Sequence, residues 1–402
     1  MATYNYKARD TKSGKIVRST IQADSESAAA RLLMVQNVVP IEIKVSSGNS
    51  KLLDKLNRVT SKDLVIMTRQ MSTMLNAGLP LAQVLATVAE QSQSRALKNI
   101  MSDVLSQVNG GGAFSDALAK YPDVFSQFYV AIVRAGETSG KLDTSLQRLA
   151  DQLEHDADML SKIKGAMVYP AIVLTVIVGV VIYMLVTLVP QVKHLYDDMH
   201  KTLPIQTQIL QAVAGFLMQY WYITLLAVGI AIFFFGRWKR TTGGRKLIDA
   251  LKLNAPMFKD LIRKLYMARF SRTMQTLVQA GVSILESLRI SSDSVNNVLV
   301  HDDITAAMGP VKNGKSTSEA LSGRDYILPF VPEMIKIGEN SGSIDTMLGK
   351  VADYYDKEVD NTIKSISTLI EPVLMVVMAI MIGFIVAAVL LPIYQLSTGL
   401  QH

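Results

Sequence analysis

The chain has 402 residues, of which 49% are hydrophobic and 19% charged, with a net charge of +7 and no cysteine. This charged fraction is below the roughly 25% of ordinary soluble proteins, which argues against a disordered chain or a wholly soluble enzyme. Without cysteine there can be no disulfide framework, thiolate metal site or cysteine nucleophile. The five histidines lack the spacing of metal ligands, so neither a metal nor another cofactor is expected.

The N-terminal segment, residues 1–45, differs in pattern from the rest of the chain and predicts a small ββαβ unit. Its predicted elements are strands at 4–8, 16–23 and 40–45 and a helix at 25–35. The N-terminus has no apolar stretch like that of a signal peptide, so we expect it to stay in the cytoplasm. A polar linker at 46–61 then leads to a first helical domain at 62–168.

Three later segments are apolar and long enough to cross a bilayer, which takes about 20 helical residues. A buried core helix is the alternative, but such a helix rarely stays apolar on every face over that length. We therefore predict transmembrane helices at 169–190, 216–238 and 371–394.

The basic residues that flank these spans predict which side of the membrane each loop occupies. A dense basic cluster from Arg237 to Lys246 follows the second span, whereas the loop at 191–215 carries only two lysines. Since basic flanks stay on the cytoplasmic side, we expect this loop and the tail at 395–402 outside, and a second helical domain at 239–370 inside. The positive charge then serves topology and contact with lipid, and nucleic-acid binding is not expected.

The chain also contains an internal repeat with a spacing of about 200 residues. TRQMSTMLNAGLPL at 68–81 matches SRTMQTLVQAGVSI at 271–284, and GETSGKLDTSL at 136–146 matches GENSGSIDTML at 338–348. The candidate motif residues pair as Arg69 and Arg272, Gly78 and Gly281, Gly136 and Gly338, Glu137 and Glu339, Gly140 and Gly342, Tyr169 and Glu371, and Pro170 and Pro372. Both copies lead into an outward span, so the second span must bring the chain back, which makes a parallel repeat unlike the inverted repeats of many transporters.

These paired residues are candidates for structural motifs or partner contacts. Gly78 and Gly281 follow helical patterns and fit left-handed helix C-caps. Arg69 and Arg272 lie among apolar neighbours and are expected to pair with carboxylates in each bundle.

The glutamates of the two GExSG segments could be charged docking points or parts of tight turns, and we favour the structural role. Pro170 and Pro372 predict a kink or a helix restart at the membrane surface. Glu371 lies at the start of the third span. It could be a functional carboxylate, or a residue at the membrane interface, where a charged side chain costs little free energy.

One catalytic pattern is present, because residues 309–316, GPVKNGKS, satisfy the phosphate-loop consensus GxxxxGK(S/T). That loop needs a buried strand before it, whereas residues 301–308 have a helical pattern. The first copy has glycine and alanine at the positions of Lys315 and Ser316. A glycine turn that precedes a helix fits both copies, so we interpret the match as structural.

Together these motifs resemble the polytopic inner-membrane platform proteins of type IV pilus and type II secretion systems over essentially the whole length. The resemblance rests on the YNYKARD and PIEIK segments, the RQM and RTM helices with their AG turns, the GExSG turns, and the YP and EP membrane boundaries. It implies a bacterial inner-membrane protein with two six-helix cytoplasmic domains, assembled as a dimer or higher homo-oligomer. The implied partners are a hexameric assembly ATPase, pilin or pseudopilin subunits, alignment-complex membrane proteins and membrane lipid.

The resemblance further implies that the protein couples the ATPase to insertion of pilin subunits into a growing fibre. No catalytic constellation is evident in the sequence, so we do not expect an enzyme. A secondary transporter or channel component is the alternative, although the spans carry few polar groups. The expected fold is therefore mainly α: a polytopic membrane protein with three transmembrane helices, two duplicated helical-bundle cytoplasmic domains and the small ββαβ unit.

Overall fold

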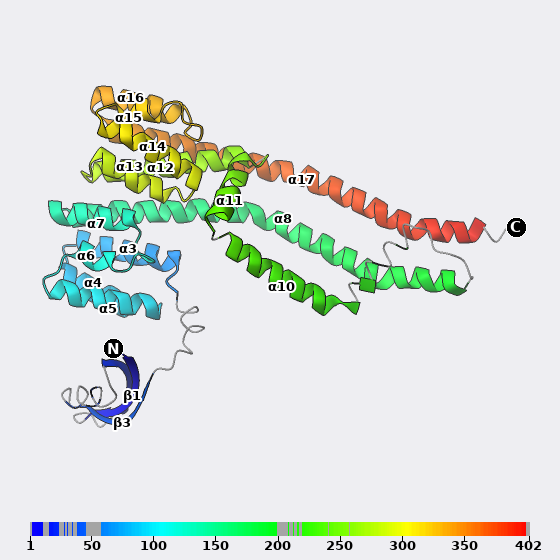
Figure 1. Ribbon diagram of the computed structural model, residues 1–402, viewed down its shortest axis with the longest axis horizontal. Coiled ribbons are helices and arrows are strands. Elements are labelled where there is room, and N and C mark those ends of the chain that lie inside the picture. Colours follow the sequence, from blue (N-terminus) through cyan, green and yellow to red (C-terminus); the bar gives the residue numbers. More distant parts are fainter. Residues whose placement is uncertain are drawn as a thin grey trace. The chain divides into compact units, whose positions relative to one another are not determined.

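The computed structural model describes most of the chain, which divides into two compact units (Figure 1). The described residues are 2–10, 16–23, 38–45, 58–198, 219–239, 241–256 and 258–398, together with 28, 30, 34, 208, 212, 215 and 216. One unit comprises Met1–Asp63 with Ser92–Asn99, and the other comprises Leu64–Gln91 with Ile100–His402.

The first unit contains a three-stranded antiparallel sheet in the order β2-β1-β3. Its strands are β1 (Ala2–Asp10), β2 (Ile16–Ala23) and β3 (Val38–Val45). Pro40 lies in β3, an edge strand, where a missing backbone N–H is tolerated, and the register shifts beside it, between Lys7 and Ala8 of β1. The helix predicted at 25–35 falls mostly outside the described residues, so the complete ββαβ unit stays a prediction.

The first helical copy alternates helices with short turns, and its last helix is by far the longest. Its helices are α3 (Ser61–Asn76), α4 (Leu81–Gln91), α5 (Arg95–Asn109), α6 (Phe114–Ala119), α7 (Gln127–Ser139) and α8 (Leu142–Asp198). Apolar residues recur on one face of each long helix, as helical periodicity requires. The fully buried side chains include Met71, Leu85, Phe114, Tyr129 and Leu149.

The second copy repeats this order of helices. Its elements are α12 (Lys259–Gln279), α13 (Ile284–Ser294), α14 (Val298–Lys312), α15 (Thr317–Leu321), α16 (Phe330–Ser341) and α17 (Ile344–Thr398). Its hydrophobic core includes Phe270, Leu288, Ile304, Val331 and Leu348. Within the described residues, each copy thus contains six helices, with α10 (Trp221–Trp238) and α11 (Thr242–Asn254) between the copies.

Two of the described helices, α8 and α17, contain stretches long and apolar enough to cross a membrane. The number rises to three if α10 and α11, which are bent by 96° at the break between them, count as one span. Apolar side chains in these stretches are exposed in the isolated chain, including Ile172 and Val176 of α8 and Ile380 of α17. An apolar surface on all sides of a helix is what contact with lipid requires.

Helices α8 and α17 run without interruption from the bundles into their apolar stretches (Figure 1). Pro170 and Pro372 lie inside these helices, so of the predicted kink or restart the restart is wrong, and a kink at these positions stays a prediction. A proline removes one backbone hydrogen bond, and each helix continues past that loss. The helices also extend into the segments predicted as loop and tail, as far as Asp198 and Thr398.

Candidate functional site

In the first copy, Glu137 connects the end of α7 to the start of α6. Its Oε1 accepts a hydrogen bond from the backbone N–H of Phe114 at 2.6 Å, and its Oε2 accepts from the N–H and hydroxyl of Ser115 at 3.0 and 2.7 Å. These N–H groups belong to the first turn of α6, where a helix has unpaired donors and a partial positive charge. The carboxylate at the end of α7 therefore stabilises the start of α6.

Glu339 makes the equivalent contact in the second copy. It accepts from the N–H of Thr317 at 2.5 Å and from the hydroxyl of Ser318 at 2.5 Å, both at the start of α15. The N–H of Ser318 lies farther away, at 3.4 Å from each carboxylate oxygen. Both GExSG glutamates thus contact their own copy, which favours the structural interpretation over a charged docking point.

The glycines before these glutamates allow two helices to come close together. A Cβ on Gly136 would lie 2.6 Å from the Cβ of Ser145, and one on Gly338 would lie 2.7 Å from the Cα of Ile344. The other paired glycines have left-handed backbone at the ends of helices, with φ of 83° at Gly78, 84° at Gly281, 69° at Gly140 and 66° at Gly342. The turns therefore need glycine at these positions.

Arg69 of α3 is held between two carboxylates of α8. Its Nε and Nη2 donate to Glu154 at 2.6 and 2.5 Å, and Nη2 also donates to Asp151 at 2.5 Å. The hydrogen bonds from Arg69 hold the pKa of the Glu154 carboxyl below its usual value. The pairing that we expected for this arginine is therefore present, and it ties the first helix of the bundle to the last.

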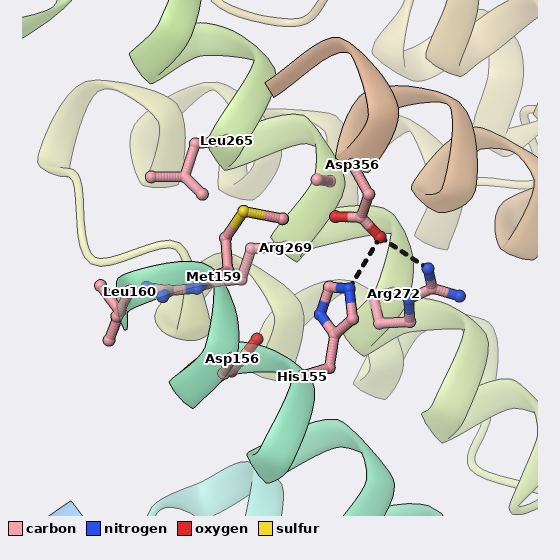
Figure 2. A pocket seen from close by; sticks show the side chains of 9 residues that line it. His155, Asp156, Met159, Leu160, Leu265, Arg269, Arg272 and Asp356 are labelled. Carbon is pink, nitrogen blue, oxygen red and sulfur yellow. Dashed lines mark hydrogen bonds and ion pairs between the residues drawn. The ribbon is translucent and has the colours of Figure 1, made fainter. Parts of the chain in front are cut away.

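Arg272 repeats the arrangement between α12 and α17, with Nη2 at 2.5 Å from Asp353 and 2.7 Å from Asp356. Here a third group joins, because Nε2 of His155, on α8 of the first copy, lies 3.1 Å from Oδ2 of Asp356 (Figure 2). The pair in the second copy is therefore part of the contact between copies.

The ionisation of this cluster follows from these contacts. The hydrogen bond to Asp356 raises the pKa of His155, more than burial and Arg272 lower it. Burial by itself would raise the pKa of Asp356, but the hydrogen bonds from His155 and Arg272 outweigh it and hold that pKa low. The charged forms of His155 and Asp356 therefore stabilise each other.

A small cavity of about 10 Å³ lies beside this cluster, enough for about one water molecule. Its lining includes Asp156, Met159, Leu265 and Arg269 beside the three residues already described (Figure 2). Burial raises the pKa of Asp156, and the charge of Arg269 opposes that effect. The cavity is too small to hold a substrate or cofactor.

Further contacts join the two copies on either side of this cluster. Arg148 donates to the backbone carbonyl of Gln279 at 2.8 Å, and Lys162 pairs with Asp360 at 2.8 Å. Between α8 and the second copy lies an apolar seam, whose buried members are Met159, Leu261, Val359 and Ile366. Sequence reasoning missed this interface because its partners lie up to about 200 residues apart and no local motif marks them.

The residues at the predicted membrane boundaries lie on the surfaces of α8 and α17. Tyr169 is exposed on α8, beside Pro170, and Glu371 is exposed on α17, beside Pro372. These residues are not part of the charged cluster between the copies.

The phosphate-loop match has the structure that the repeat predicts. Helix α14 precedes the glycine turn, in place of the strand that a phosphate loop requires. Lys315 pairs with Glu319 at 3.0 Å, and the hydroxyl of Ser316 caps α15 by accepting from the N–H of Glu319 at 3.2 Å. Among the described residues, there is also no group of three or more side chains that could hold a metal ion.

Two six-helix copies, each ending in a helix that continues into an apolar stretch, define a duplicated helical-bundle membrane protein. The chain belongs to the type II secretion system protein F family. The family model matches residues 67–190 and residues 270–392, one match in each copy of the repeat. The model of the N-terminal domain of the same family matches residues 1–44.

Relatives of known name match along nearly the whole chain. The chain is 40% identical to the type IV pilus assembly protein PilC of Thermus thermophilus, over 98% of each chain. It is 35% identical to the protein of the same name from Myxococcus xanthus, over 97% of this chain and 94% of the relative. It is 33% identical to the type II secretion system protein F of Vibrio cholerae, over 99% of each chain. The family resemblance inferred from the sequence is thereby confirmed.

Proposed function

We propose that this protein is the inner-membrane platform of a type IV pilus or related type II secretion machine. In this role it couples a cytoplasmic hexameric ATPase to the insertion of pilin or pseudopilin subunits into a growing fibre. The names of the relatives support such a role. We propose no enzymatic activity, since the charged groups of the site pair with one another and serve packing.

The observation that carries the proposal is the parallel arrangement of α8 and α17. His155 contacts Asp356, and Lys162 contacts Asp360 farther along both helices, so the two helices run in the same direction. If both helices cross the bilayer, both bundles lie on the same side of it. An additional crossing must then return the chain between them, and α10 is the apolar helix in that position.

The proposed topology follows from this arrangement and from the basic cluster after α10. The N-terminus, the first bundle at 62–168 and the second bundle at 239–370 lie in the cytoplasm, and the loop at 191–215 and the tail at 395–402 lie outside. The continuous helices could transmit movement of a bundle directly into the membrane. The proposed assembly is a homo-oligomer beside alignment-complex membrane proteins.

Reporter fusions test this topology at two equivalent turns. Fusions after Gly111 and after Gly314 should both report a cytoplasmic location, and a fusion within 191–215 should report an exported one. An exported signal at either glycine turn would overturn the parallel arrangement.

The coupling role is tested by ATP hydrolysis and by crosslinking in cells. Purified protein should hydrolyse no ATP above background, and the K315A variant should behave identically. Crosslinkers in each bundle should capture the hexameric ATPase from one bundle or both. Hydrolysis that depends on Lys315, or flux through proteoliposomes, would instead support an enzyme or a transporter.

A further inference from the structure

Helix α11 is an amphipathic helix that lies outside both segments matched by the family model. It is attached to the second bundle along one face. Asp249 is buried and accepts a hydrogen bond from the N–H of Val298 at 3.1 Å, at the start of α14. Leu253, one turn later, is fully buried in the bundle core.

The opposite face of α11 exposes two leucines, which no described residue covers. Leu247 and Leu251 lie one turn apart and are 52% and 61% exposed. Basic side chains accompany this pair on α11. Lys246 lies 3.6 Å from Asp302 in an exposed pair, Arg245 donates to Asn296 at 3.2 Å, and Lys252 pairs with Asp249 at 2.9 Å. An apolar stripe on a helix that also carries exposed basic side chains is the pattern of helices that lie in the surface of a membrane.

The connection to α10 fixes where this face is presented. The hydroxyl of Thr241 donates to the last carbonyl of α10, that of Trp238, at 2.7 Å and accepts from the N–H of Gly244 at 3.2 Å. A Cβ at position 244 would lie only 2.1 Å from the Trp238 carbonyl oxygen, so only glycine permits this turn. Between the described residues of α10 and α11 the bend is 96° (Figure 1).

We propose that α11 lies in the cytoplasmic surface of the membrane and binds anionic lipid. Leu247 and Leu251 enter the boundary between headgroups and acyl chains, and Arg245 and Lys246 exchange their exposed contacts with Asn296 and Asp302 for lipid phosphates. A helix perpendicular to a spanning helix lies in the membrane plane, and Trp238 at the end of α10 belongs to a residue type enriched at that interface.

Charge favours an anionic bilayer over a protein partner as the occupant of this face. Residues 237–246 contain five basic side chains and no acidic one. Each basic residue near an anionic surface strengthens binding about fivefold. The inference rests on a crossing by α10 without α11, over the predicted span 216–238, which the experiment must therefore test separately.

The absence of cysteine permits a direct test with the full chain. Single-cysteine variants L251C, I337C and F234C are labelled with a nitroxide and reconstituted in nanodiscs of phosphatidylglycerol and phosphatidylethanolamine. Collisions with oxygen, which concentrates in lipid, are compared with collisions with a water-soluble nickel chelate. Ile337 is the matched control, since it is an exposed apolar residue of α16, at 52% against 61% for Leu251.

The label at position 251 should collide more with oxygen than with nickel, and the label at 337 should show the reverse. Position 234, 64% exposed on α10, should report the bilayer interior. A lipid signal at 234 with an aqueous signal at 251 overturns the inference and leaves the third span intact. An aqueous signal at 234 refutes the third span itself, and with it this inference.

The charge requirement is tested by changing lipid and side chain. The K246Q variant should lower the partition of α11 into anionic nanodiscs about fivefold, and wild type in phosphatidylcholine alone should show a larger loss. Equal signals in both lipids would overturn the anionic specificity. Shielding of position 251 from both reagents, in detergent as well as in nanodiscs, would show that a protein surface covers this face and would overturn the lipid assignment.

Discussion

Removal of the Glu339 carboxylate should release the start of α15 while the rest of the second bundle stays folded. In the E339A variant, the N–H of Thr317 and the hydroxyl of Ser318 lose their acceptor. A hydrogen bond to a charged group contributes about 1.5–3 kcal/mol, and loss of a helix cap costs about 0.5–2 kcal/mol. Because these figures overlap, we expect a cost of roughly 2–4 kcal/mol for local opening. For amide hydrogens that exchange through this opening, the cost corresponds to exchange about 30-fold to 1000-fold faster.

Hydrogen–deuterium exchange of the full chain in nanodiscs measures this opening. Exchange should accelerate at 317–321 in E339A and at 114–119 in E137A, each without change in the other copy. E319A is the matched control, because Glu319 lies in the same helix but makes only an exposed ion pair with Lys315, for which we expect less than about 1 kcal/mol. Equal acceleration by E339A and E319A, or acceleration in both copies at once, would refute the reasoning.

Three further predictions concern the contact between the copies and the close approach of helices. Since Asp356 raises the pKa of His155, their contact should be complete below about pH 6.5 and weaken as pH rises through the higher folded pKa. Crosslinking between the copies should show this dependence and lose it in H155Q, and a persistent pH profile in H155Q would contradict the assignment. G338A should lower the free energy of unfolding by about 1–3 kcal/mol in denaturant titrations. G349A should cost less, because its Cβ would meet only the end of a glutamine side chain, and an equal cost would count against a backbone clash. R272M should cost about 1–3 kcal/mol in thermal stability, since it leaves the half-buried Asp356 without its guanidinium, and no change would show that the pair is dispensable.

Much of the architecture could be predicted from the sequence because the repeat presents each motif twice. The turns at Gly78 and Gly281 and the pairing of Arg69 follow from local patterns and from apolar surroundings. The phosphate-loop match could be rejected because the first copy lacks its lysine. Duplication thus separates residues that the fold requires from residues that match a motif by chance.

Contacts between segments far apart in the chain could not be predicted from local sequence patterns. The GExSG glutamates lie 22 to 23 residues after the N–H groups that they bind, so no local pattern decides between a docking point and an intramolecular role. The spacing of the histidines indicates no metal site and says nothing else about His155. Its partner Asp356 lies in the other copy, so no local pattern connects the two residues. The prolines suggested a kink or a restart because local preference disfavours proline in helices, but both long helices continue through these positions without a restart.

The two copies share the hydrogen bonds and ion pairs that hold each bundle together, but they differ in the residues that contact the other copy. Glu137 and Glu339 each secure a short helix within their own bundle, and Arg69 and Arg272 each tie the first helix to the last. Only the second of these arginine pairs also contacts a side chain of the other copy, through Asp356. A rigid bundle with a continuous helix at its end would move as one body, so relative movement of the two bundles must be accommodated where α7 and α8 of the first copy contact α12, α13 and α17 of the second. That contact includes paired charges and a short apolar seam, and charged pairs of this kind can exchange partners at lower cost than a packed core can be opened.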